Sequence, residues 1–291
     1  MADINNENKT RERILVSVLA HPDDETFGMG GTLAKYAHEG VTVYLICATR
    51  GEVGEMDKKY LEGFESTSQR REFELRCASK KLGIKEVFFL NYLDSGMAGS
   101  EHNRDPQSLW ATPVMEVAAK VYDLLKQLKP QVVLTFDPIG GYRHPDHIRI
   151  HEATVKAFMN LLPENNQSPD LTYQPQKLYY HTIPKTLIKI SVFLMRLVGR
   201  DPRKFGANKD IDLQAIVEVD FPIHAIVKYA KYAQLVAEAS ACHASQGGSK
   251  LGGGILGWLR KLFSSKDLYM RAYPEPLSGE KKESDLFTGV R

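Results

Sequence analysis

Short runs of aliphatic and β-branched residues alternate with longer helical patterns through the first half of the chain. The apolar runs cover residues 14–19, 41–47, 86–90 and 131–136, and the helical patterns between them cover 28–39, 68–82 and 112–128. Strand–helix–strand units of this length place consecutive strands parallel to one another with right-handed crossovers. We therefore expect an α/β fold with a Rossmann-like, mostly parallel, doubly wound sheet.

The second half of the chain is less regular and predicts an irregular C-terminal elaboration of the same sheet. Helices are expected at 147–161, 186–198 and 222–241, and strands at 177–181 and 215–219. We expect a single α/β domain spanning residues 1–291, with mobile ends at 1–13 and 278–291. The segment 246–263 begins with many glycines and is interpreted as an insertion.

Composition excludes several classes of function. The chain is 43% hydrophobic and 25% charged with a net charge of +2, which gives no case for a nucleic-acid partner. The apolar stretch 183–197 contains three cationic residues and is too charged and too short to cross a bilayer, so no transmembrane segment is expected. Three cysteines without a CxxC pair are typical of a reduced, cytoplasmic protein. A homo-oligomer stays possible.

Two motifs rich in histidine and aspartate follow two of the predicted strands. HPDDE occupies residues 21–25 after the first strand, and GGYRHPDH occupies 140–147 after the fourth. In the common strand order 3-2-1-4-5 these two strands are neighbours, and ligands bind beyond their carboxyl ends. Either motif alone would often be a simple turn or helix cap. Together they predict an active site at the C-terminal ends of the strands.

The residue types in the two motifs favour a catalytic metal. His21, Asp24 and His147 supply two imidazoles and a carboxylate, a set that suits zinc with one position left for water. Zinc lowers the pKa of such a water to about 7. Asp23 lies beside a ligand and is placed to act as general base. The ligand types do not exclude Fe²⁺ or another divalent ion.

Three further residues of the second motif are candidates for catalysis. His144 would stabilise an oxyanion or protonate a leaving amine, and Asp146 would orient His144. Tyr142 offers a hydroxyl donor to the same oxyanion. Arg50 follows the second strand on the same edge of the sheet, where it either contacts an anionic substrate or forms a surface ion pair.

The motifs AHPDDE and GGYxHPDH resemble those of the PIG-L/LmbE-like zinc de-N-acetylases. That family includes the N-acetylglucosaminyl-phosphatidylinositol deacetylases and the deacetylases of the mycothiol and bacillithiol pathways. The resemblance implies zinc on His21, Asp24 and His147 and a general base at Asp23. It also implies substrate-binding roles for Arg71 and Asp94.

Three functional hypotheses follow from these residues. The first is zinc-dependent removal of an N-acyl group, in particular acetyl, from an N-acetylglucosamine-type or glucosaminyl-conjugate substrate. The second is an amidase acting on larger acyl or thiol-conjugate amides, which is kept open because residues 177–181 are similar to mycothiol-conjugate amidases. The third is a catalytically silent sugar-binding module. Residues 255–263 are basic and aromatic, so they are interpreted as a lid, an oligomer contact or a membrane-surface contact.

Overall fold

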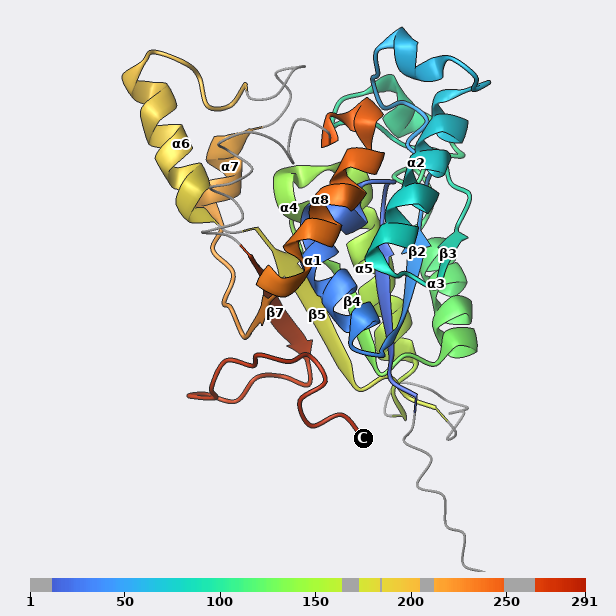
Figure 1. Ribbon diagram of the computed structural model, residues 1–291, viewed down its shortest axis with the longest axis vertical. Helices are drawn as coiled ribbons and strands as arrows, with labels where there is room; N and C mark the ends of the chain where they lie inside the picture. Colours follow the sequence, from blue (N-terminus) through green and yellow to red (C-terminus); the bar gives the residue numbers. More distant parts are fainter. Residues whose placement is uncertain (1–11, 164–172, 184, 205–211, 249–264) are drawn as a thin grey trace, which may run out of the picture.

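A seven-stranded sheet forms the centre of the molecule in the computed structural model (Figure 1). The structure describes residues 12–163, 173–183, 185–204, 212–248 and 265–291. The strand order is β3-β2-β1-β4-β5-β7-β6. Strands β1 to β5 pair in parallel, whereas β7 is antiparallel to both β5 and β6. The strands are β1 (Ile14–Leu19), β2 (Thr42–Cys47), β3 (Glu86–Phe89), β4 (Val132–Phe136), β5 (Lys177–Thr182), β6 (Ala225–Lys228) and β7 (Lys266–Tyr273).

The five parallel strands confirm the expected α/β class and the strand order 3-2-1-4-5. The two central strands β1 and β4 are almost entirely buried, because helices cover both faces of the sheet. Strands in that position must be apolar at every residue rather than at alternate residues, which is why they appear as continuous aliphatic runs. The order reverses between β1 and β4, where both sequence motifs emerge.

Helices pack against both faces of the sheet. Helices α1, α2 and α8 contact one another on one face, and α3 and α5 contact each other on the opposite face (Figure 1). The α-helices are α1 (Asp24–His38), α2 (Thr67–Leu82), α3 (Val114–Leu128), α4 (Gly140–Arg143), α5 (Pro145–Asn160), α6 (Lys185–Leu197), α7 (Leu213–Glu218) and α8 (Ala233–Cys242). Among the described residues no helix is long and apolar enough to cross a membrane.

Local sequence explains where these helices begin and end. Ser66 caps α2 by accepting a hydrogen bond from the backbone N–H of Gln69, and Gly83 ends that helix with φ of 80°. Pro145 stands in the first turn of α5, where its missing N–H costs no hydrogen bond. Because strands β1 to β5 are parallel, the loops that follow them all lie at the same edge of the sheet.

Two expectations for the second half of the chain are wrong. Residues 215–219 were expected to form a strand but belong mainly to the helix α7, and the long helix expected at 222–241 is divided into β6 and α8. Strand β7 was not expected at all. Its buried positions alternate with half-buried and exposed ones, and it pairs with β5 across a long sequence separation, so its polar residues hid it from a search for apolar runs.

The C-terminal segment 278–291 packs against the body and is not the expected mobile tail. Leu286 is fully buried, and the Tyr36 hydroxyl accepts a hydrogen bond from its backbone N–H. Tyr36 also donates to Asp285 over 2.8 Å. Leu286 and Phe287 are two consecutive apolar residues in a polar segment. A run of two residues shows no helix or strand periodicity, so the sequence did not reveal this contact. The predictions for 1–11 and for 249–264, with the membrane-surface contact at 255–263, lie outside the described residues.

Cys77 on α2 and Cys242 at the end of α8 form a disulfide, with Cα atoms 5.8 Å apart. The expectation that all three cysteines stay unpaired is therefore wrong, and only Cys47 is free. The two partners are 165 residues apart in the sequence, so no local spacing could have signalled the bond. The cytoplasmic location stays a prediction.

Reducing this disulfide is expected to lower the free energy of unfolding by up to about 5 kcal/mol. The bond closes a loop of 165 residues, and a loop of that length removes much conformational entropy from the unfolded chain. Urea unfolding of oxidised and reduced protein measures the difference. A thiol titration of unfolded, unreduced protein should find one free cysteine, and three free cysteines would contradict the pairing.

Candidate metal centre

Three loops at the carboxyl ends of the parallel strands bring the candidate residues together. Residues 20–25 follow β1, residues 90–96 follow β3, and residues 137–147 follow β4. His21, His144 and His147 are all buried, and their ligand nitrogens lie within 4.8 Å of one another. The expected meeting of the two motifs at the sheet's switch point is therefore confirmed.

The side chains around His21 and His147 determine which ring nitrogen of each faces the centre. Nδ1 of His147 lies 3.2 Å from the carbonyl oxygen of Gly140, to which it can only donate, so the lone pair is on Nε2. Nε2 of His21 lies 3.1 Å from Asp146 Oδ2, which places the lone pair of His21 on Nδ1. The two nitrogens that carry lone pairs face each other over 3.2 Å. Two lone pairs so placed repel each other unless a proton or a metal cation lies between them. Although burial opposes it, the Asp94, Asp146 and Asp24 carboxylates raise the pKa of His21 well above its usual value, so this position favours a positive charge.

Asp24 completes a donor set that fits a divalent metal. Its carboxylate oxygens lie 3.3 Å from His147 Nε2 and 3.6 Å from His21 Nδ1. Ligands held about 2.0–2.2 Å from a tetrahedral zinc lie about 3.3–3.6 Å from one another, so the observed spacing matches. Although burial opposes it, the neighbouring His147 and His21 hold the pKa of Asp24 well below its usual value. Asp24 is thus ionised, which is the state in which a carboxylate can bind a metal.

His144 is close enough to be a ligand but its ring is engaged differently. Its Nδ1 accepts a hydrogen bond from the backbone N–H of Asp146 and so caps α5. A neutral ring that accepts at Nδ1 carries its proton on Nε2 and is therefore a donor. Burial, together with His21 and His147, lowers the pKa of His144 well below its usual value. His144 is a neutral hydrogen-bond donor beside the metal position.

Asp146 and Asp94 lie behind His21 on the side away from His147. Asp146 Oδ2 contacts His21 Nε2 and also accepts the backbone N–H of Ser95 over 2.9 Å. The Asp94 carboxylate lies 3.5 Å from the same His21 nitrogen. Asp146 was expected to orient His144, but its carboxylate orients His21 instead. Carboxylates in that position fix the ring of a metal-binding histidine and increase its basicity.

Asp23 is held in an uncommon backbone conformation at the start of α1. Its φ is 120°, a region that only a few non-glycine residues adopt, and Asp and Asn adopt it most readily. Its backbone N–H donates to Glu25 Oε2 over 2.9 Å, and its own carboxylate accepts a bond from Arg71. Burial raises the pKa of Asp23 to about 6, even though Arg71 acts in the opposite direction. Such strain at an active site holds a side chain in a fixed position.

Arg71 lies underneath the HPDDE loop. Its guanidinium donates to the carbonyl oxygens of Pro22 and Gly51 as well as to Asp23, and the residue is only 4% exposed. Gly51 leaves room for this contact, because a Cβ there would lie 1.9 Å from the guanidinium. The predicted substrate-binding role of Arg71 is untested. Its contacts support Asp23 from behind.

Replacing Arg71 with lysine is expected to lower kcat about 10- to 100-fold with little change in KM. Lysine cannot reproduce the planar fork that bonds three acceptors, and a small displacement of Asp23 costs rate. Steady-state kinetics on a soluble substrate measures both constants. A large rise in KM with kcat preserved would instead indicate direct substrate binding. Arg76→Lys on the exposed side of the same helix is the matched control.

Arg50 lies further from the centre. Its guanidinium donates to Glu72 and Asn91 and lies over the ring of Phe89. Of the two alternatives for Arg50, the structure shows the ion pair. The Asp94 carboxylate accepts the N–H of Gly96, and the residue is 5% exposed. The predicted contacts of Arg50 and Asp94 with substrate stay predictions.

A buried pair that was not among the predicted site residues lies behind Asp23. His243 Nε2 lies 2.7 Å from Glu25 Oε1, and both side chains are fully buried. Glu25 therefore links His243 to the backbone of Asp23. Glu25 carried a weak signal as an acid at a helix N-terminus, but its partner lies 218 residues away and could not be assigned.

Tyr142 stands at the wall of the site, with its ring edge-on to the rings of His144 and His147. The turn before it needs Gly140, whose φ is 64° and whose missing Cβ leaves room for His147. A Cβ at this position would lie 2.8 Å from the Cβ of His147. The GGY sequence thus presents an aromatic wall next to the two histidines.

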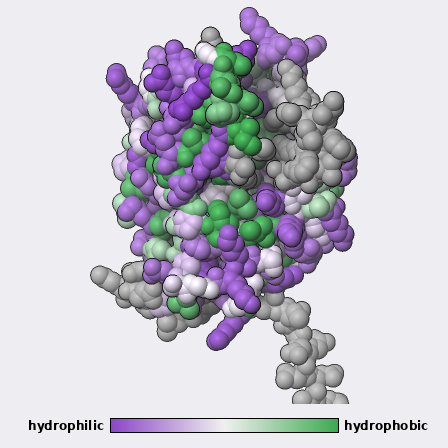
Figure 2. Space-filling model, turned by 90° about the vertical axis from the view of Figure 1, so that its left-hand side faces the viewer, coloured by the Kyte–Doolittle hydropathy of each residue, from purple (hydrophilic) through white to green (hydrophobic). Residues whose placement is uncertain are grey.

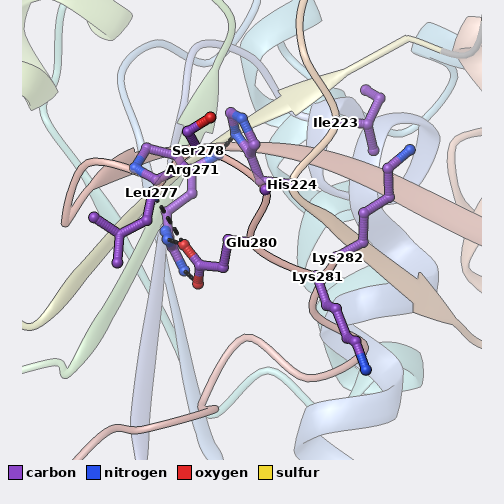
Figure 3. Close-up of a pocket in the computed structure, with 10 residues that line it drawn as sticks. Ile223, His224, Arg271, Leu277, Ser278, Glu280, Lys281 and Lys282 are labelled. Atoms are coloured by element: carbon purple, nitrogen blue, oxygen red, sulfur yellow. Dashed lines mark hydrogen bonds and ion pairs between the residues drawn. The ribbon is translucent and has the colours of Figure 1, made fainter.

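A separate pocket of about 330 Å³ lies beside β7 and does not include these residues (Figure 3). Arg271 and Glu280 line it and bond each other across it, as the dashed lines in Figure 3 show. Arg271 also donates to Glu283 over 2.8 Å. Because none of the histidines and carboxylates of the metal centre lines it, this pocket is not a candidate for the reaction.

Comparison with known proteins identifies relatives over most of the chain. The family model described as PIG-L, GlcNAc-PI de-N-acetylase, matches residues 16–158. A 1D-myo-inositol 2-acetamido-2-deoxy-alpha-D-glucopyranoside deacetylase from Kineococcus radiotolerans is 30% identical over 313 residues. That match covers 98% of this chain and 85% of the relative.

Solved structures show the same fold at lower identity. The N,N'-diacetylchitobiose deacetylase from Pyrococcus horikoshii matches with a TM-score of 0.58 and 20% identity, over 90% of this chain and 84% of that one. GalB, a 4-carboxy-2-hydroxymuconate hydratase from Pseudomonas putida, also matches with a TM-score of 0.58, at 14% identity over 92% of this chain and 99% of that one. Proteins with different reactions share this fold, so the reaction must be argued from the site.

Proposed function

Because the chain belongs to the PIG-L family of metal-dependent de-N-acetylases, we propose that it hydrolyses the N-acetyl group of an N-acetylglucosamine conjugate. The observation that supports this proposal best is the pair of histidine lone pairs that face each other beside Asp24. We propose zinc as the metal and His21, Asp24 and His147 as its ligands. The relatives' name favours an inositol-like group as the aglycone.

Zinc bound there would act as a Lewis acid on the amide carbonyl and would make water a nucleophile at neutral pH. Asp23 accepts the proton of the attacking water as the new C–O bond forms. Arg71 and the Glu25 contact hold Asp23 in place during this step. Asp23 then returns the proton to the nitrogen as the C–N bond breaks, which releases acetate and an amine.

His144 and Tyr142 support the charge that develops on the carbonyl oxygen. The neutral ring of His144 donates from Nε2, and Tyr142 stands edge-on to that ring with its hydroxyl protonated, because burial raises its pKa well above the usual value. Preorganised donors of this kind lower the barrier because they need no rearrangement as charge appears.

Release of the free amine from a panel of substrates, with acetate measured beside it for the N-acetyl members, tests the proposed function. The panel contains N-acetylglucosamine, N-acetylglucosaminyl-inositol and an N-acyl analogue with a bulky acyl group. We expect zinc-loaded protein to release acetate, with the inositol conjugate as the better substrate. Faster cleavage of the bulky analogue would move the function to the amidase alternative. Zinc binding without turnover of any member would favour the sugar-binding module.

A further inference from the structure

Helix α6 presents an apolar stripe to solvent. The apolar residues of this stripe recur three or four positions apart along the helix, so they lie on one side of it. Each is between 48% and 70% exposed. Five of the eight large exposed hydrophobic residues in the described part of the chain belong to this stripe, namely Ile190, Phe193, Leu194, Leu197 and Val198. We call these five residues the α6 stripe.

The opposite side of α6 is already occupied. Val192 packs with Leu213 and Ile216 of α7, and the half-buried Ile188 and Met195 join them. The α6 stripe is therefore additional to the apolar surface that holds the helix on the protein. In Figure 1, α6 and α7 stand outside the layers formed by the sheet and the other helices. Figure 2 faces this side and shows a hydrophobic band near the top, bordered by hydrophilic side chains.

Cationic residues accompany the α6 stripe. The segment 185–204 contains six Lys and Arg residues and a single acid, Asp201, although the whole chain has a net charge of only +2. Lys189 and Arg196 flank the stripe on the side of Phe193, and Arg200 follows the end of the helix; all three are exposed, and Lys189 also forms an ion pair with Asp220. An apolar stripe with cations along its border has the pattern of helices that lie in the surface of an anionic membrane.

The packed side of α6, opposite the stripe, adjoins the candidate metal centre. Tyr142 packs against the same apolar cluster that anchors α6, and its ring contacts the rings of His144 and His147. Tyr142 thus joins the occupied side of α6 to the candidate metal centre, and the stripe lies on the outer side of the same helix.

We propose that the α6 stripe and its cations dock the protein on an anionic lipid surface. Charge distinguishes this partner from a second copy of the chain. In a two-fold symmetric dimer the same patch meets itself, so the cations of both copies would face each other. An anionic bilayer neutralises these cations while the apolar residues enter the interface.

Vesicle flotation tests the proposal on the full chain. The two vesicle types are phosphatidylcholine alone and phosphatidylcholine mixed with phosphatidylglycerol. We expect partition into the mixed vesicles to exceed partition into phosphatidylcholine by at least about tenfold, since each cation near an anionic surface contributes about fivefold. High salt should reduce the difference, because the Debye length falls to about 3 Å at 1 M.

Two double variants separate the two contributions. Phe193→Ser with Leu197→Ser should lower partition about tenfold or more by removing apolar area. Arg196→Gln with Arg200→Gln should lower it about 25-fold on mixed vesicles only. Leu277→Ser is the matched control, because Leu277 is 76% exposed and lines the separate pocket beside β7. Thermal melting and acetate release from a soluble substrate confirm that each variant is folded.

Two results would overturn the proposal. One is equal or absent partition of the wild-type protein with both vesicle types. The other is a stable dimer in analytical ultracentrifugation that Phe193→Ser with Leu197→Ser dissociates, which would assign the stripe to self-association. Neither result would affect acetate release from the soluble substrates, so the test is independent of the proposed function.

Discussion

Replacing Asp23 with asparagine is expected to lower kcat for acetate release by about 10²- to 10⁴-fold, the range typical of a lost general base. Asparagine has nearly the same shape and tolerates the φ of 120°, so the loop should keep its conformation. It cannot accept the proton of the attacking water. The measurement is kcat for zinc-loaded protein, with bound zinc determined on the same sample.

The result depends on zinc staying bound, because Asp23 is a neighbour of the metal ligands and is not one itself. We expect one zinc per chain in both the wild type and the variant. Asp123→Asn changes an exposed aspartate on α3, outside the site, and should leave kcat within about twofold, as surface substitutions generally do. A variant that keeps full zinc and most of its activity would contradict the role of Asp23.

Alanine at Asp24 and alanine at His144 are expected to have opposite effects on metal affinity. Asp24→Ala removes a proposed ligand and should weaken zinc binding by more than the 10- to 100-fold typical of residues that only contact ligands. His144→Ala should leave zinc binding within that smaller range. It should lower kcat about 10²- to 10³-fold instead, because a donor to the oxyanion is lost.

Competition with a coloured zinc chelator measures the affinity of both variants, and activity at saturating zinc measures kcat. The comparison is informative because His21, His144 and His147 could themselves hold a metal ion, with their ligand nitrogens within 4.8 Å of one another. Greater loss of zinc affinity in His144→Ala than in Asp24→Ala would show that the three histidines hold the metal. The cap that His144 forms on α5 would then have to open.

The sequence predicted the fold where structure depends on local patterns. The central strands β1 and β4 are covered on both faces, so they are apolar throughout and were recognised from that run alone. Strand β7 alternates in burial, and helix α7 lies where a strand was expected. Their conformations depend on partners distant in sequence, and a single-sequence pattern carries no information about such partners.

The candidate site was likewise predictable only where it depends on local sequence and strand order. The two motifs identified the loops, and the strand order alone predicted that His21 and His147 would meet. What the sequence could not show is how each side chain is turned. The partner of Asp146 is His21 and not His144, and Arg71 lies beneath Asp23 with 4% exposure. His243 required knowledge that α8 packs beside α1.

A crystal structure of zinc-loaded protein with anomalous diffraction at the zinc edge tests the central claim most directly. We expect one anomalous peak about 2.0–2.2 Å from His21 Nδ1, His147 Nε2 and a carboxylate oxygen of Asp24, with Nε2 of His144 turned toward the open position. A peak on the other face of His21, between Asp94 and Asp146, or a peak away from these loops, would contradict it.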